Sequence, residues 1–265
     1  MDLQGARVLL TGATGGLGRA IAEAVAARGG TLILSGRTLA DLEALADELP
    51  GDHEAQEADL AEPGAAAELC GRAGIVDVLV ANAGLPGSGL IADFSAEQIE
   101  RALRVNLEAP VQMTRELLPP MQERASGHLV YVASLSGKIA TARTSLYNAT
   151  KFGLRGFALG TREDLRGSGV GASIVSPGFI RDAGMFADGG GQVPGYVGTS
   201  SPEEVGAGVV EAVTDNVGEI VVAPRQLRVA AQLGLVAPEP IGKVAAKLGA
   251  ADMGDEMSSA QQDKR

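Results

Sequence analysis

Several residue types are scarce in this sequence, and each shortage excludes a class of function. The chain has no tryptophan, only 3% aromatic residues and a formal net charge of −11. Proteins that bind nucleic acid present basic surfaces, and those that bind single strands also stack bases on aromatic rings. We therefore expect no nucleic-acid partner.

Cysteine and histidine are scarce as well. Cys70 is the single cysteine, so no internal disulfide can form, and His53 and His128 lie too far apart for metal-ligand spacing. We expect no metal site. No apolar run reaches the roughly 18–20 residues of a membrane span, and the start of the chain lacks the pattern of a secretory signal. These features predict a cytoplasmic protein without a membrane span.

The sequence does contain a regular alternation of two patterns, spread over 265 residues of which 45% are apolar. Seven short runs rich in β-branched residues or leucine are typical of strands, at 6–12, 31–36, 53–60, 76–84, 128–134, 170–178 and 218–224. Helical patterns with apolar residues three and four apart lie between them, at 16–29, 39–49, 95–124 and 145–167. Apolar strands that alternate with helices predict an α/β fold, a doubly wound parallel sheet with helices on both faces.

Helix caps and the C-terminal residues complete this outline. The segments 95–98 (SAEQ) and 201–204 (SPEE) are capping boxes that mark helix starts. We expect a single domain over residues 1–251, including a C-terminal helical extension at about 225–250. This extension is expected to pack on its own domain, with a membrane-surface or partner-docking role as the alternative. The polar segment 252–265 is expected to be a disordered tail.

A glycine-rich stretch, TGATGGLGRAIA (11–22), joins the first predicted strand to the first predicted helix. Gly12, Gly16 and Gly18 would allow a tight turn, a close approach of the backbone to a pyrophosphate, and close packing of helix on strand. The helix N-terminus would supply free N–H donors for the phosphates. A plain turn is the alternative, but the position between strand and helix favours nucleotide binding.

The second strand ends in SGRT (35–38), where a ribose-reading residue is expected. No carboxylate is present to accept from a ribose 2′-hydroxyl, whereas the guanidinium of Arg37 suits a 2′-phosphate. This favours NADP over NAD. In the alternative, Arg37 covers the sheet edge and Thr38 caps the next helix. Asp59, at the end of the third predicted strand, is placed to accept from the adenine amino group, or is an exposed loop carboxylate.

Further motifs follow in order: NAG (82–84), Asn106 in RVNLEAP, Ser134 in VYVASLSG, YNATK (147–151) and SPGFI (176–180). With the glycine-rich stretch, they resemble the classical short-chain dehydrogenase/reductase family over about residues 5–222. The resemblance implies a single Rossmann-like domain, a nicotinamide dinucleotide cofactor, and a catalytic tetrad of Asn106, Ser134, Tyr147 and Lys151. The cofactor contacts are expected at Gly12, Thr14, Gly16, Leu17, Gly18, Arg37, Thr38, Asp59, Leu60, Asn82, Ala83, Gly84, Tyr147, Lys151, Pro177, Gly178 and Ile180.

The chemistry of three tetrad residues also follows from their side chains. Tyr147 and Lys151 are four residues apart, so on a helix they share a face, and the ammonium is expected to lower the phenol pKa from near 10. A carbonyl that accepts a hydride needs a proton donor and a hydrogen-bond donor, for which Tyr147 and the Ser134 hydroxyl are the candidates. The resemblance also implies that Lys151 binds the nicotinamide ribose hydroxyls. Singly, each residue could have an ordinary structural role.

Asn106 is followed four residues later by Pro110. Proline has no N–H, so a helix here cannot bond residue 110 to the carbonyl of Asn106, which is expected to be left free. In the family the corresponding residue holds a water near the active-site lysine. The alternative is a simple proline kink in a long helix.

The segment 176–201 is glycine-rich and irregular, which is typical of a functional or mobile loop. The family's substrate loop corresponds to about residues 178–201, called the substrate segment below. Five residues after Pro177, where the family often has a threonine, stands Asp182, which puts the nicotinamide-side contacts in doubt. An apolar lining, and so a lipophilic or uncharged substrate, is expected from Met185, Phe186, Val193 and Tyr196, although these residues could equally pin the loop to the core.

These residues predict an enzyme that uses NADPH to reduce a ketone or aldehyde to an alcohol, reversibly. A non-catalytic NADP-binding regulatory protein is one alternative, which an intact tetrad disfavours. An epimerase or dehydratase on the same fold is another, disfavoured by Arg37 and by the chain length. The long predicted helices at 95–124 and 145–167 correspond to surfaces through which relatives form homodimers and homotetramers.

Overall fold

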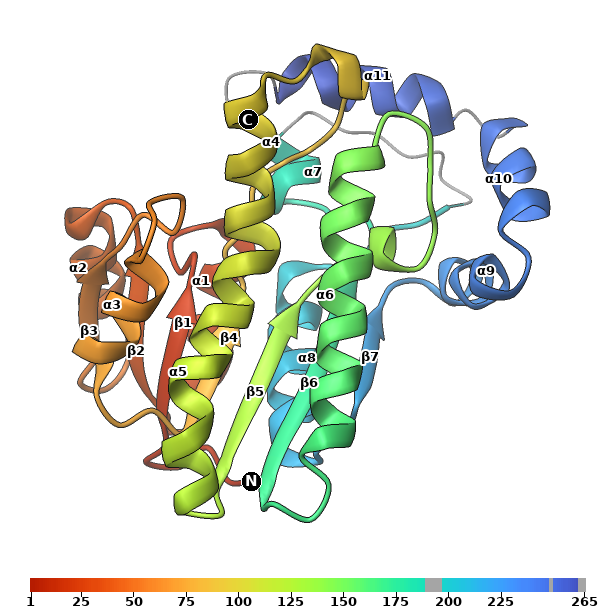
Figure 1. The fold of residues 1–265 in the computed structure, drawn as a ribbon. Helices are drawn as coiled ribbons and strands as arrows, with labels where there is room; N and C mark the ends of the chain where they lie inside the picture. The colour runs from red at the N-terminus through yellow and green to blue at the C-terminus, as the bar shows by residue number, and fades with distance from the viewer. Residues whose placement is uncertain (189–196, 248–249, 262–265) are drawn as a thin grey trace.

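The predicted sheet is present in the computed structural model of the chain, which describes residues 1–188, 197–247 and 250–261 (Figure 1). Seven parallel strands lie in the order β3-β2-β1-β4-β5-β6-β7. The order reverses between β1 and β4, which confirms the doubly wound α/β fold. The strands are β1 (Arg7–Thr11), β2 (Thr31–Gly36), β3 (Glu54–Glu57), β4 (Val78–Ala81), β5 (Gly127–Val132), β6 (Val170–Pro177) and β7 (Glu219–Val222).

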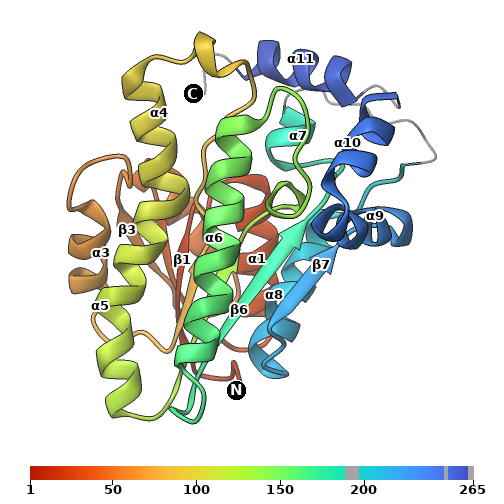
Figure 2. The ribbon, with the colours of Figure 1, turned by 45° about the vertical axis from the view of Figure 1, so that its right-hand side comes forward.

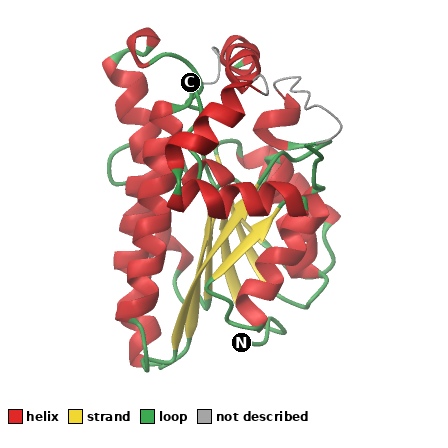
Figure 3. Cartoon of the chain, turned by 90° about the vertical axis from the view of Figure 1, so that its right-hand side faces the viewer, coloured by secondary structure: helices red, strands yellow, loops and turns green. Residues whose placement is uncertain are grey.

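Helices cover both faces of this sheet (Figure 3). Their bounds are α1 (Gly16–Ala26), α2 (Leu39–Glu48), α3 (Ala65–Ala73), α4 (Ala96–Leu103), α5 (Ala109–Glu123), α6 (Ser145–Asp164), α7 (Gly184–Asp188), α8 (Pro202–Thr214), α9 (Arg225–Val236), α10 (Pro238–Lys247) and α11 (Ala250–Ala260). Across the described ranges, every helix is too short, too polar or both to cross a bilayer.

Successive residues of the inner strands enter two different cores. In β1, Val8 and Leu10 pack with residues of α1, α2 and α8, whereas Leu9 packs with residues of α3, α5 and α6. In the sheet, Val8 lies between Leu32 of β2 and Val78 of β4. Because both faces are covered, both sets of side chains are buried in the inner strands, which is why β1 and β4 are largely apolar, whereas the edge strand β3 (EAQE) is polar and partly exposed.

The long helix predicted at 95–124 is interrupted. The capping box is present, since Ser95 and Gln98 bond reciprocally at the start of α4. A π-helical turn, Arg104–Glu108, then separates α4 from α5, and within it the Ala109 N–H donates to the Arg104 carbonyl five residues earlier. Pro110, which has no N–H, lies in the first turn of α5. The interruption is centred on Asn106, at a place where proline makes a regular helix impossible.

The structure differs from the sequence analysis at two helices. Helix α3 was not predicted, because it lies outside the four helical patterns identified above. The segment 252–265 was expected to be disordered, but its residues up to 260 belong to α11, while 262–265 lie outside the described residues. The polar composition of α11 gave no indication of a helix. Tertiary contacts hold it: α11 packs so closely on Arg143 that a Cβ on Gly254 would lie 2.9 Å from the Cβ of Arg143.

The packing of α8 on α1 makes a testable prediction about stability. A Cβ on Gly206 of α8 would lie 2.6 Å from the carbonyl oxygen of Ala20 in α1, whereas a Cβ on Gly160 of α6 would have no atom within 4 Å. Gly206→Ala should therefore lower the free energy of unfolding by about 1–3 kcal/mol. Gly160→Ala, its matched control, should raise it by about 0.5–1 kcal/mol because alanine favours helices. Urea unfolding of both variants measures this, and an equal effect of the two would contradict the packing described.

Candidate active site

The glycine-rich loop after β1 is shaped for a phosphate group. Gly12 has φ of +64°, and a Cβ there would lie 2.9 Å from the Cα of Ala83, so the two backbones touch. A Cβ on Gly18 would lie 2.0 Å from the Gly12 carbonyl oxygen, so α1 packs directly on the loop. Gly15 precedes α1 without a side-chain cap, and the first turn of the helix has no acidic residue. Its N–H groups can therefore receive an anion, with the exposed Thr14 beside them.

Thr11, at the end of β1, fastens this loop to the NAG motif. Its hydroxyl oxygen accepts the N–H groups of Asn82 and Ala83, both at 3.1 Å. The amide nitrogen of Asn82 donates to the carbonyls of Thr11 and Gly12, at 3.0 and 3.1 Å. The ends of β1 and β4 are thus joined. Thr11 was not among the predicted site residues, although a threonine before the first glycine of the loop was a signal that could have identified it.

The residues expected to meet the adenosine end lie at the edge of the sheet. Arg37 is exposed directly after β2, and its guanidinium has no hydrogen-bond or ion-pair partner among the described residues. Thr38 is the N-cap of α2 but makes no side-chain capping bond, so its hydroxyl is available. The Asp59 carboxylate accepts the N–H of Ala61 at 2.9 Å, and Leu60 is buried beside it.

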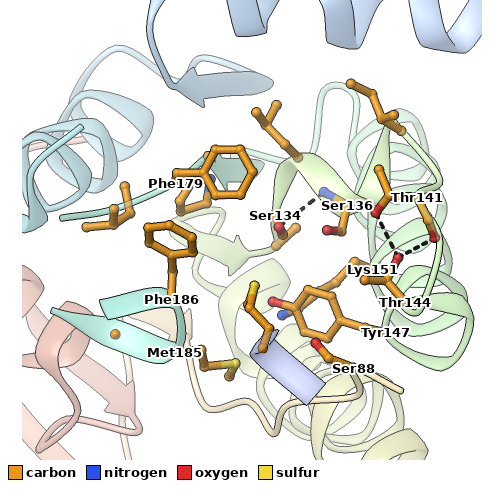
Figure 4. Close-up of a pocket in the computed structure, with 18 of the residues that line it drawn as sticks. Ser88, Ser134, Ser136, Thr141, Thr144, Tyr147, Lys151, Phe179, Met185 and Phe186 are labelled. Atoms are coloured by element: carbon orange, nitrogen blue, oxygen red, sulfur yellow. Dashed lines mark hydrogen bonds between the residues drawn. The ribbon is translucent and has the colours of Figure 1, made fainter. Parts of the chain in front are cut away.

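Three tetrad residues meet in one cavity (Figure 4). Ser134 stands between β5 and the 3₁₀ turn η3 (Leu135–Gly137), and its side chain hydrogen-bonds to the Tyr147 phenol. The Lys151 Nζ lies 5.6 Å from the centroid of the Tyr147 ring, one turn further along α6, and donates to the Val132 carbonyl at 3.2 Å. The cavity thus contains a phenol, a hydroxyl and an amine within one site.

The pKa of the Tyr147 phenol was expected to fall below its ordinary value of about 10, but in the chain by itself it rises. Burial raises the pKa of Tyr147 to about 12, and the hydrogen bond with Ser134 opposes that rise without cancelling it. Burial also lowers the pKa of Lys151 to about 8. Helical spacing brings the two groups together, but both are enclosed by protein, and loss of water disfavours the charged form of each.

Asn106 lies behind the cavity and is buried. Its side chain pairs with the backbone of Leu85: the Leu85 N–H donates to Oδ1 at 2.6 Å, and Nδ2 donates to the Leu85 carbonyl at 2.9 Å. Nδ2 also donates to the Thr150 hydroxyl at 3.4 Å. Asn106 therefore anchors the chain just after the NAG motif, a role that sequence reasoning missed. A water on its backbone carbonyl stays a prediction.

Close contacts fasten the turn η3 to α6. Asn148, next to Tyr147, donates from Nδ2 to the carbonyls of Ser136 and Ile139, at 2.7 and 3.0 Å. A Cβ on Gly137 would lie 2.7 Å from the Lys151 carbonyl oxygen, so the turn and the helix touch there without a side chain between them. The position of Ser134 relative to the two α6 residues depends on these contacts.

A buried group of charges reinforces the same junction. The Glu219 carboxylate of β7 lies 3.0 Å from the Nζ of Lys138, which follows η3 and has no exposed side-chain surface. The same carboxylate accepts from Nε and Nη2 of Arg155 in α6, at 2.8 and 3.1 Å. Burial acts to raise the Glu219 pKa, but the bonds from Arg155 and Lys138 outweigh it and hold the pKa below its usual value. Sequence reasoning could not find this triad, because its members are widely separated in the chain.

The cavity has a volume of about 370 Å³, which suits a small-molecule site. Not every predicted site residue lines it. Those that do are Leu17, Asn82, Gly84, Ser134, Tyr147, Lys151, Pro177, Gly178 and Ile180. Those outside it are Gly12, Thr14, Gly16, Gly18, Arg37, Thr38, Asp59, Leu60, Ala83 and Asn106. The cavity therefore contains the residues predicted for the reaction, and the residues predicted to contact the phosphates and the adenosine lie outside it.

The start of the substrate segment lies on the glycine-rich loop. A Cβ on Gly16 would lie 2.5 Å from the Cβ of Ala183. Asp182 has φ of +67° and points outward, with 77% of its side chain exposed and Arg181 Nε 3.5 Å away. The Asp182 carboxylate does not line the cavity. The charge that stands where the family often has a threonine is therefore exposed to solvent.

Part of the expected apolar lining is observed. Met185 and Phe186 line the cavity, and the Phe186 ring packs on that of Phe179 with centroids 5.0 Å apart (Figure 4). Val193 and Tyr196 lie outside the described residues. The observed part is consistent with an uncharged substrate.

Comparisons with known proteins find a matching family model and several similar proteins. The model of the family described as short chain dehydrogenase matches residues 6–190. The ketoacyl reductase HetN of Nostoc sp. is 33% identical over 262 residues, covering 94% of this chain and 91% of that protein. The dehydrogenase/reductase SDR family member 7B of Mus musculus is 38% identical over 67% of this chain and 58% of its own length. The solved structure of a 3-oxoacyl (acyl-carrier-protein) reductase from Agrobacterium tumefaciens with NADP bound is 26% identical, with a TM-score of 0.77 over 83% of this chain and 94% of that one.

The lowered pKa of Lys151 can be tested directly. The chain has five lysines, so labelling them with ¹³C at Cε gives a simple NMR spectrum. In the protein without cofactor, the Lys151 amine should be charged below about pH 8 and neutral above it, because burial lowers its pKa to about 8. The resonance that titrates there should vanish in Lys151→Met and persist in Lys243→Met, whose lysine is exposed on α10. Titration of Lys151 at the usual lysine value would contradict the burial described.

Proposed function

The chain belongs to the short-chain dehydrogenase family and is an oxidoreductase of that family; from this we propose that it uses NADPH to reduce a ketone or aldehyde to an alcohol, reversibly. The observation that carries the proposal is the meeting of the Ser134 hydroxyl, the Tyr147 phenol and the Lys151 amine in one largely apolar cavity beside the glycine-rich loop.

The residues present fit a dinucleotide. Gly12 and Gly18 leave no room for side chains where the backbone must approach a pyrophosphate, and the uncapped N-terminus of α1 can receive its charge. Arg37 and Thr38 would hold a 2′-phosphate, and no carboxylate stands at SGRT (35–38) to accept from a 2′-hydroxyl. When bound, the nicotinamide would supply the hydride in reduction and accept it in oxidation.

Tyr147 is the proposed proton donor. As a hydride reaches the carbonyl carbon, the carbonyl oxygen becomes negative and takes the phenolic proton, which yields the alcohol and a phenolate. A pKa raised to about 12 by burial keeps the phenol protonated at neutral pH, which is the form that reduction requires. In the reverse direction, the phenolate would accept the proton of the alcohol.

Ser134 and Lys151 are proposed to support this transfer. The Ser134 hydroxyl, already bonded to the phenol, would donate a hydrogen bond to the developing oxyanion. A protonated Lys151, 5.6 Å from the ring centroid, would stabilise the phenolate that remains. In the family resemblance this lysine also binds the nicotinamide ribose hydroxyls. Homodimeric or homotetrameric assembly and a cytoplasmic location stay predictions.

Removal of the phenolic hydroxyl tests the proton donor. Tyr147→Phe should lower kcat for ketone reduction by about 10²- to 10⁴-fold, because the oxyanion loses its proton source. The absorbance of NADPH at 340 nm measures the rate, and fluorescence titration should show NADPH still bound. Ser134→Ala should also lose activity, by more than Ser136→Ala on the same turn. Activity of Tyr147→Phe within tenfold of the natural chain would contradict the role of Tyr147, and NADPH binding without turnover of any carbonyl would favour a regulatory protein.

Cofactor preference tests Arg37. Arg37→Leu should raise the KM for NADPH by about 10- to 100-fold, since a hydrogen bond to a charged group contributes about 1.5–3 kcal/mol, and should leave the KM for NADH nearly unchanged. Arg28→Leu, which removes the same charge from an exposed position after α1, is the control and should change neither value. Equal changes for both cofactors in Arg37→Leu would support the alternative in which Arg37 only covers the sheet edge.

A further inference from the structure

The C-terminal helices α10 and α11 lie beyond the carboxyl ends of the strands (Figures 1 and 2), and both contribute residues to the lining of the cavity. Both follow the region that the family model matches, residues 6–190. Five of their residues and Gln261, which directly follows α11, line the cavity and are together called the roof: Ile241, Val244, Ala245, Gly254, Met257 and Gln261.

Two side-chain contacts connect this part of the chain to the loop before α6 and to α7. Asp255 of α11 pairs with Arg143, which lies just before α6, with Nε–Oδ1 and Nη2–Oδ2 distances of 2.7 and 3.3 Å. Arg143 holds a φ of +63°, rare for a residue with a side chain. At the other end, the Gln261 amide nitrogen donates to the Met185 carbonyl of α7 at 2.9 Å. Helix α11 therefore spans from the loop before Tyr147 to the substrate segment.

The walls of the cavity carry little charge. Among the described residues, Lys151 is the only lining residue with a charged side chain, and it is committed to the Tyr147 ring and the Val132 carbonyl. No other lining residue in the described ranges, 1–188, 197–247 and 250–261, carries a guanidinium or an ammonium that could hold a carboxylate or phosphate. Besides Ser134, Tyr147 and Lys151, the lining includes the apolar side chains of Met185 and Phe186 and, in the roof, those of Ile241, Val244, Ala245 and Met257. A chemical group that enters between them must be uncharged and apolar.

We propose that the roof binds the apolar portion of an uncharged carbonyl substrate and sets the chain length that the enzyme prefers. This rests on the proposed reductase function. The carbonyl lies at Ser134 and Tyr147, and the hydrocarbon portion extends toward Ile241 and Met257. Each methylene that leaves water for this surface strengthens binding, up to about fourfold in kcat/KM.

A homologous series of methyl ketones, from butan-2-one to decan-2-one, tests the proposal with NADPH as reductant. In the natural chain, kcat/KM should rise over several added carbons. Ile241→Ser and Met257→Ser should lower the ratio of the decan-2-one value to the butan-2-one value by about tenfold, since serine removes apolar surface from the roof. Asp255→Asn, which removes only the charge paired with Arg143, should lower the ratio less.

Leu233→Ser provides the matched control. Leu233 is 51% exposed on α9 and does not line the cavity, so the same polar substitution there should leave the ratio as it is. A keto acid as long as decan-2-one, with a terminal carboxylate, should be reduced at least tenfold less efficiently. Thermal unfolding confirms that each variant is folded.

The outcomes separate the two proposals. A flat ketone series, or an unchanged ratio in folded Ile241→Ser and Met257→Ser, overturns the role of the roof while the reductase function stands. Calorimetric titration with decan-2-one measures how tightly the protein binds this ketone, independently of turnover. Suppose that the natural chain binds decan-2-one without reducing it, and that both roof variants bind it more weakly. This result would support the proposed role of the roof in binding and contradict the reductase function. Absence of both binding and reduction would overturn the roof.

Discussion

The contact between the turn η3 and helix α6 is the constraint on which the site depends. Ser134 leads into the turn, whereas Tyr147 and Lys151 belong to the helix, so the three groups meet only where turn and helix touch. Gly137 permits that contact, Asn148 bonds across it, and the Glu219 carboxylate links its two sides through Lys138 and Arg155. Breaking a buried ion pair leaves an uncompensated charge, which strongly destabilises the arrangement. These charges therefore define one geometry for the site.

A parallel sheet explains why the cofactor end and the reaction end are adjacent. Strands β1, β4, β5 and β6 all end at the same edge, so the residues that follow them collect there, at the reversal of strand order between β1 and β4. Thr11 and Asn82 then join two of these strand ends by hydrogen bonds. The glycine-rich loop, the NAG motif and Ser134 are positioned by one sheet, and helices on both faces keep that sheet rigid.

Burial affects the pKa values of Tyr147 and Lys151 more than the proximity of the two side chains does. The spacing of Tyr147 and Lys151 suggests that the amine lowers the phenol pKa, yet enclosure raises the pKa of Tyr147 to about 12 and lowers that of Lys151 to about 8. Residues of α10 and α11 are among those that line this cavity. The ion pair between Asp255 and Arg143 and the hydrogen bond from Gln261 to Met185 connect this part of the chain to the elements around Tyr147.

The sequence by itself determined several features that depend on near neighbours: the apolar inner strands, the capping boxes at Ser95 and Ser201, the glycine-rich loop, and Tyr147 beside Lys151 on one helical face. Such features repeat with the period of a helix or strand, so a short stretch of chain specifies them. The tertiary structure alone decided the Lys138–Glu219–Arg155 triad, the pairing of Asn106 with Leu85, and the helix at 250–260 above the cavity. Each of these joins residues far apart in the chain, and their free energy comes from burial and pairing that exist only when the whole fold has formed.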